Sequence, residues 1–204
     1  MAYVLTVDQI KSQRRPDQVA AALHQLRGIS TVLPFTRTVG DEFQGVLDDS
    51  LSVTTAILGL MRTQQWHIGL GIGPVDRPLP ADSRSARGPG FVAARTAVDE
   101  AKRATSHVRI VSSLPNDADA HDAEVVLRLI SLLRERRSPQ GWEAIDLMAA
   151  GHTQAETALR LDISRQAVGQ RLQATQWATE SDAVPVMARL LARADAMTVG
   201  QERG

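Results

Sequence analysis

Apolar positions in the first 111 residues follow two different periods. Residues 3–7 form a short apolar run that ends at Asp8, which is typical of a buried strand. Residues 17–27 carry apolar side chains three and four positions apart, which predicts a helix. The remaining predicted elements are two short strands in 37–47 around a turn at Gly40-Asp41-Glu42, a helix over 51–63, a strand over 68–72, a helix over 91–105 and a strand over 108–111.

Glycines alternate with apolar residues along the predicted strand over 68–72. Three apolar residues alternate there with Gly69, Gly71 and Gly73, so one face of the strand has no side chains and a backbone or a ligand can approach it closely. The order of elements, β-α-β-β-α-β-α-β, predicts a mixed sheet with helices packed on it. We therefore expect an α+β domain over 1–111, then a turn-rich linker over 112–121.

The second half reads as helices throughout. A helix is predicted over 122–136, and Ser138-Pro139 opens the next with an N-cap and a proline at the first helical position. Thr153-Gln154-Ala155-Glu156 is a capping box for a helix over 153–161, and Ser164 caps another that runs to about 177. A last helix over 186–196 carries a broad apolar stripe that suits packing or dimerisation. We expect an all-α domain over 122–204.

The segment around residue 162 has the spacing of a helix-turn-helix. Ala158 supplies the small residue where two helices cross, Asp162 the tight turn, and Ile163 and Val168 the apolar residues beneath it. Residues 139–177 resemble the helix-turn-helix of sigma-factor region 4 and of LuxR-type regulators. The resemblance implies that the helix after the turn reads DNA; the alternative is a plain helical bundle used for dimerisation.

The predicted recognition helix offers side chains suited to base edges. Arginine pairs with guanine and glutamine with adenine through two hydrogen bonds each. Arg171 is placed to reach phosphate. The expected DNA-binding residues are Arg165, Gln166, Gln170, Arg171 and Gln173.

Charge and composition narrow the function classes. The chain has 23 basic and 23 acidic residues, spread evenly over its halves, so DNA contact must come from a local patch. It has no cysteine, which excludes disulfides and thiolate chemistry and fits a cytoplasmic protein. No stretch is apolar enough to span a membrane, and no secretory signal is apparent. The five histidines are scattered without ligand spacing and give no support for zinc.

Two carboxylates are the candidate chemistry of the first domain. If the first strand lies beside the hairpin, Asp8 and Asp41 converge, and two such carboxylates can hold Mg²⁺ on a nucleotide phosphate. The alternative is that Asp41 is simply a good turn residue. Arg84, Arg87 and Arg95 are candidate phosphate ligands, or else members of a solvated loop and helix.

These segments carry a family resemblance. Arg37-Thr38-Val39-Gly40-Asp41-Glu42-Phe43 resembles the metal-binding hairpin of class III nucleotidyl cyclases and GGDEF enzymes, and the run Ala93-Ala94-Arg95 resembles the helix bearing their transition-state arginine. Residues 1–111 are most similar to the SatD family, through Gly40-Asp41-Glu42-Phe43-Gln44. The resemblance implies a palm-like (ferredoxin-like) sheet, metal binding by Asp8 and Asp41, and binding of a nucleotide, for which Arg84, Arg87 and Arg95 are the candidate ligands. It makes Asp41 and Arg95 the catalytic candidates.

The chain departs from the cyclase pattern at one position that bears on catalysis. Cyclases have an asparagine four residues before that arginine, where this chain has Phe91. Because a cyclase must stabilise charge on a pentavalent phosphate, we expect no robust turnover. The expected function is a DNA-binding transcriptional regulator, a homodimer, whose first domain senses a nucleotide or Mg²⁺. Two alternatives remain: an active Mg²⁺-dependent nucleotidyl-transfer enzyme with a helical assembly module, and a purely structural dimer.

Overall fold

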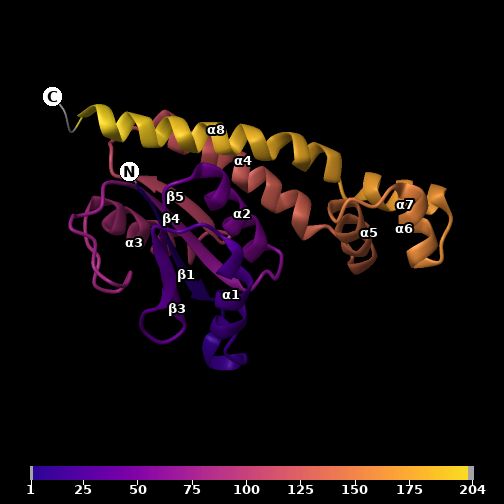
Figure 1. The fold of residues 1–204 in the computed structure, drawn as a ribbon, viewed down its shortest axis with the longest axis horizontal. Coiled ribbons are helices and arrows are strands. Elements are labelled where there is room, and N and C mark those ends of the chain that lie inside the picture. The colour runs from indigo at the N-terminus through magenta and orange to yellow at the C-terminus, as the bar shows by residue number, and fades with distance from the viewer. Residues whose placement is uncertain (1, 202–204) are drawn as a thin grey trace. The chain divides into compact units, whose positions relative to one another are not determined.

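The computed structural model describes residues 2–201 and has a mixed α+β fold (Figure 1). Its five-stranded sheet has the order β2-β3-β1-β4-β5. All neighbouring strands are antiparallel except β4 and β5, which are parallel. The expected α+β class with a mixed sheet is confirmed at this level. The strands are β1 (Ala2–Gln9), β2 (Leu33–Arg37), β3 (Glu42–Leu47), β4 (Trp66–Gly73) and β5 (Val108–Ser112).

The chain divides into two compact units. The sheet unit comprises Met1–Arg128 and Val186–Gly204, and the helical unit comprises Leu129–Pro185. The division therefore falls inside α4 (Ala118–Glu135) and α8 (Trp177–Gln201), not at the expected linker over 112–121. The turn-rich composition there has a local cause: the Asp117 carboxylate accepts a hydrogen bond from the Ala120 N–H at the start of α4.

One face of the sheet is covered closely by a helix. α3 (Pro89–Ala101) packs on β4 because the glycines of that strand leave room for its backbone. A Cβ atom on Gly69 would lie 2.2 Å from the Val98 nitrogen, and one on Gly71 would lie 2.2 Å from the Gly90 carbonyl oxygen. The bare strand face predicted from the sequence is thus filled by a helix backbone.

The opposite face carries the apolar core of the sheet unit. Tyr3, Leu5 and Val7 alternate along β1 and are buried, as are five apolar residues of α2 (Ser50–Met61): Val53, Ala56, Ile57, Leu58 and Leu60. The Tyr3 hydroxyl donates a hydrogen bond to the Leu191 carbonyl of α8 at 3.0 Å. The remaining short helices of this unit are α1 (Val19–Gln25) and the 3-10 turns η1 (Ser12–Arg14) and η2 (Leu26–Gly28).

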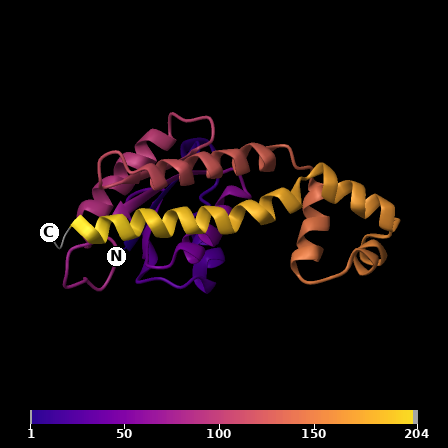
Figure 2. The ribbon, with the colours of Figure 1, turned by 90° about the horizontal axis from the view of Figure 1, so that it is seen from above.

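The apolar stripe expected over 186–196 belongs to a longer helix and is used for packing. Figure 2 shows α8 as one continuous helix. Met187, Leu191 and Ala194 are fully buried within the chain, so this stripe is not free to pair two copies. Of the two uses that the pattern allows, packing and dimerisation, the structure shows packing within the chain. No helix in residues 2–201 is long and apolar enough to cross a membrane.

The helices of the helical unit begin where their caps predict. The hydroxyl oxygens of Ser138, Thr153 and Ser164 each accept a hydrogen bond from a backbone N–H in the first turn of the helix that follows. The last of these helices ends at residue 174 rather than 177, because Gln176 adopts φ 52° and breaks the helical path before α8. The three helices are α5 (Pro139–Ala149), α6 (Gln154–Leu161) and α7 (Arg165–Ala174).

A buried charged cluster holds the helical unit together. Glu180 accepts from Arg134 at 2.6 Å and pairs with Arg137 at 2.7 Å, and the side chains of Glu180 and Arg137 are 8% and 1% exposed. Both guanidiniums also lie over the Trp142 ring. Arg137 donates from Nε to the Thr175 carbonyl at the end of α7. Burial alone would raise the pKa of Glu180, but the two arginines outweigh it and lower that pKa.

Candidate functional site

The uncovered part of the α3-facing side of the sheet is polar. Residues at alternate positions of a strand share a face, and cross-strand pairing aligns Thr6 with Gln44, and Asp8 with Glu42. α3 covers β4, so these four side chains of β1 and β3 remain beside it instead of beneath it. They form the base of two neighbouring hollows.

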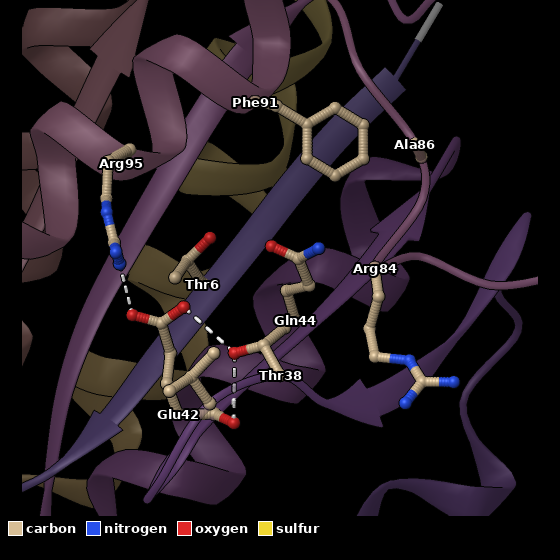
Figure 3. Close-up of a pocket in the computed structure, with 9 residues that line it drawn as sticks. Thr6, Thr38, Glu42, Gln44, Arg84, Ala86, Phe91 and Arg95 are labelled. Atoms are coloured by element: carbon tan, nitrogen blue, oxygen red, sulfur yellow. Dashed lines mark hydrogen bonds and ion pairs between the residues drawn. The ribbon is translucent and has the colours of Figure 1, made fainter.

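The first hollow centres on Glu42. It is a cavity of about 390 Å³ (Figure 3). The Glu42 carboxylate accepts a hydrogen bond from the Thr38 hydroxyl at 3.0 Å and forms an ion pair with Arg95 of α3. Glu42 is 13% exposed, whereas Arg95 is 59% exposed. Arg95 is therefore the partner free to turn toward an anion. The cavity is lined by Thr6, Thr38, Val39, Glu42, Gln44, Arg84, Ala86, Phe91 and Arg95.

The loop between β4 and α3 is fastened to the floor of this hollow. The Gln44 side-chain amide donates to the Ser83 carbonyl at 2.6 Å, and the Ser83 hydroxyl donates to the Gln44 carbonyl at 3.0 Å. Ser83 is fully buried, so this double contact fixes the next residue, Arg84, at the rim. Arg84 pairs with Asp82 at 3.0 Å, and in Figure 3 its guanidinium points away from Glu42 and Arg95.

The second hollow contains both predicted metal ligands. Asp8 and Asp41 line it together with His67 and Lys102, and its volume is about 520 Å³. The Asp8 carboxylate pairs with the Lys102 ammonium at 3.3 Å. Burial raises the pKa of Asp8; Lys102 opposes that rise, and the negative charges of Asp41 and Glu42 add to it. Asp41 is thus near enough for its charge to act on Asp8.

The donor set of this hollow can be compared with what Mg²⁺ requires. Magnesium keeps several waters and is commonly held by one or two carboxylates together with substrate phosphates. Two carboxylates in one open, polar hollow fit that requirement, with Lys102 as the charge an incoming cation would displace. No group of three or more His, Asp or Glu side chains within residues 2–201 is arranged as a metal site.

Two of the three predicted phosphate ligands line the same hollow. Arg84 and Arg95 line the first hollow, but Arg87, exposed in the same loop as Arg84, is not among its lining residues. The sequence analysis assigns no role to Glu42, Thr6 and Gln44. The pattern that marks these residues as members of a site is a polar side chain at every second position of two otherwise buried strands.

A second candidate surface lies on α7. Asp162 adopts φ 52° and ψ 48°, the left-handed conformation that the turn requires, and Ala158 and Val168 are buried beside it. Ile163 is half-buried. Four of the five predicted DNA-binding side chains are exposed: Arg165, Gln166, Gln170 and Gln173.

Arg171 differs from the other four. It is 27% exposed and lies 3.5 Å from Glu143 and 3.5 Å from the Gln140 carbonyl, both on α5. Part of its side chain therefore contributes to packing between α5 and α7.

Comparisons of the chain with protein-family models, with curated proteins and with solved structures find no match.

Proposed function

We propose that the protein is a DNA-binding transcriptional regulator whose sheet unit binds a nucleotide together with Mg²⁺. The observation that carries the proposal is the row of exposed side chains on α7: Arg165, Gln166, Gln170 and Gln173. These are the residue types that read guanine and adenine in the major groove, and two of them open the helix, where a recognition helix first meets base edges.

The local geometry around α7 supports this use. α6 and α7 are joined by a three-residue connection with a left-handed residue at Asp162, and α7 carries two arginines and no carboxylate from Arg165 to Ala174. A helix-turn-helix uses such a connection to hold the recognition helix against its neighbours.

The balanced charge of the chain implies that one copy binds DNA weakly, because phosphate neutralisation supplies most non-specific affinity. We propose a homodimer that places two copies of α7 about 34–36 Å apart, one turn of the duplex. The pairing surface lies elsewhere than the buried stripe of α8.

The sheet unit supplies the proposed sensor, a palm-like domain. Arg95 and Arg84 would take phosphate oxygens, and Asp8 and Asp41 would hold Mg²⁺, which neutralises phosphate charge. Glu42 holds the Arg95 guanidinium until a phosphate competes for it. Phe91 lines the hollow where catalysis would need a polar donor, so we propose binding without turnover.

The DNA-binding proposal is tested by fluorescence titration of genomic fragments at low and moderate salt, with the solution mass measured in parallel. We expect salt-dependent binding that is weakened in Gln166→Ala and Gln170→Ala. A matched control is Gln154→Ala on α6. Failure of folded protein to bind any fragment at low salt would leave the helices as an assembly module.

The nucleotide proposal is tested by calorimetric titration of nucleoside triphosphates with and without Mg²⁺, followed by analysis of products. We expect binding that requires Mg²⁺ and falls in Arg95→Ala, with the triphosphate recovered intact. Product that forms in the wild type and disappears in Asp41→Asn would instead identify an active nucleotidyl-transfer enzyme. Absence of binding to folded protein would overturn the sensor role.

A further inference from the structure

Two histidines that are forty positions apart in the sequence meet in the sheet unit. His67 lies on β4, and His107 occupies the turn before β5. Their Nδ1 atoms are 3.3 Å apart, and the ring centroids are 4.9 Å apart with an angle of 70° between the planes. The parallel pairing of β4 with β5 brings them together, which is why spacing along the chain gives no sign of the pair.

We propose that His67 and His107 form a site for a divalent transition-metal ion, with Zn²⁺ as the type case and solvent in the remaining positions. Two imidazole nitrogens bound tetrahedrally to zinc at about 2.0–2.1 Å lie about 3.4 Å from each other. The 3.3 Å separation, at which the two rings share a hydrogen bond, matches that spacing, and a bound ion would replace the shared proton. The site is distinct in chemistry from the proposed Mg²⁺ site, because magnesium takes oxygen ligands and imidazole suits zinc, copper and nickel.

Backbone hydrogen bonds fix the positions of the two histidines relative to each other. The Ile68 N–H donates to the His107 carbonyl at 2.9 Å, and the His107 N–H donates to the Ala104 carbonyl at 3.2 Å. A preorganised pair requires little rearrangement to bind an ion.

The protonation state of His67 suits a metal ligand. Burial, the neighbouring His107 and Lys102 all lower the pKa of His67, while Ala101 and Asp41 oppose the shift. The ring is therefore neutral near pH 7, as a metal ligand must be.

Access and local charge also allow an ion to enter. Both histidines are half-buried, and His67 lines the hollow that contains Asp8 and Asp41. Lys102, whose charge acts on His67, lies 3.3 Å from Asp8 and 3.8 Å from Asp99, so two carboxylates offset its charge.

The test is a calorimetric titration of untagged, chelator-treated full-length protein with Zn²⁺, beside visible absorption with Co²⁺. We expect one equivalent of Zn²⁺ and a tetrahedral Co²⁺ spectrum. His67→Gln and His107→Gln should each weaken Zn²⁺ binding by at least about tenfold. His121→Gln, which changes an exposed histidine of α4, is the matched control and should bind as the wild type does.

A measurement on the wild type alone covers the case in which a variant fails to fold. Imidazole NMR signals of His67 and His107 should shift together on addition of one equivalent of Zn²⁺, while those of His24, His121 and His152 stay in place. Zn²⁺ binding that is unchanged in both variants, or the absence of any shift at these two rings, would overturn the proposal.

Discussion

The two candidate surfaces differ in how their charges are satisfied. On α7 the side chains of Arg165, Gln166 and Gln170 extend into solvent. On the open sheet face, Glu42 is paired with Arg95 and Asp8 with Lys102. A partner of α7 meets groups that are already free to turn toward it, whereas a ligand of the sheet face must replace an internal ion pair. The second arrangement favours ligands whose own charges match both members of that pair.

Buried carboxylates show the same contrast between the units. Glu180 of the helical unit lies between two arginines, and its pKa is lowered despite burial. Asp8 of the sheet unit has one lysine partner and two acidic neighbours, and burial raises its pKa. Ionised Glu180 thus contributes to stability, while ionised Asp8 costs stability, as is common for groups kept for binding.

The largest expected effect comes from breaking the Glu180 cluster. Glu180→Ala leaves two arginines without their buried partner and should lower the free energy of unfolding by about 3–5 kcal/mol, measured by urea denaturation followed by tryptophan fluorescence. Glu143→Ala, which removes an exposed carboxylate 3.5 Å from Arg171, should cost less than about 1 kcal/mol.

The same cluster predicts a pH dependence. Because the folded-state pKa of Glu180 is lowered, its stabilising contribution is complete above its ordinary pKa and is lost as the pH falls through the folded-state value. In Glu180→Ala the free energy of unfolding should therefore fall less steeply as the pH is lowered. If the fall at low pH is the same as in the wild type, the arginines do not depend on the Glu180 charge.

The next largest effect is expected from glycine-to-alanine substitutions, which should change stability in opposite directions in the two units. In Gly71→Ala the new Cβ would lie 2.2 Å from the Gly90 carbonyl and 2.3 Å from the Ala94 nitrogen, so we expect a loss of about 2–3 kcal/mol. In Gly169→Ala on α7 the Cβ meets open space, and the helix should gain about 0.5–1 kcal/mol. Thermal unfolding followed by circular dichroism measures both; equal effects would contradict the packing described for β4 and α3.

Two arginines of α7 should have different effects on DNA binding. Arg165→Ala should cost about 1–3 kcal/mol at the preferred sequence and less elsewhere, because it removes a paired contact to one base. Arg171→Ala should weaken all sequences by a similar factor and reduce the salt slope by about one, as loss of a phosphate contact does. Titrations of specific and scrambled duplexes at several salt concentrations distinguish these outcomes, and identical profiles would mean that neither residue reads bases.

The smallest effect is expected at Asp8. Its raised folded-state pKa means that the native state takes up a proton more readily than the unfolded state, so the contribution of Asp8 to stability falls as the pH rises above the ordinary aspartate range. Asp8→Asn removes this dependence, and because it also removes the pair with Lys102, the net change at pH 7 should stay within about 1 kcal/mol. Urea denaturation at pH 4.5 and pH 7 compares the two proteins. A stronger loss at pH 7 would identify the ion pair as structural.

Local signals predicted most of the secondary structure. The caps at Ser138, Thr153 and Ser164 and the left-handed turn at Asp162 depend only on residues a few positions away, and all four are confirmed. Features set by strand register were harder to predict. The use of Glu42 as the partner of Arg95, and the meeting of His67 with His107, depend on which strands are neighbours. The turn-rich composition of 112–121 predicts a linker, whereas the chain passes between the two compact units inside α4 and α8, which local composition does not mark.

The path of α8 has a consequence for dissecting the molecule. The helical unit is nested within the sequence of the sheet unit, since Val186 onward returns to the latter. A truncation before residue 186 would remove Met187 and Leu191 from the apolar core and leave the Tyr3 hydroxyl without the carbonyl that accepts its hydrogen bond. Isolating the sheet unit therefore requires removing 129–185 while keeping the segment from Val186 onward, and not stopping the chain after β5.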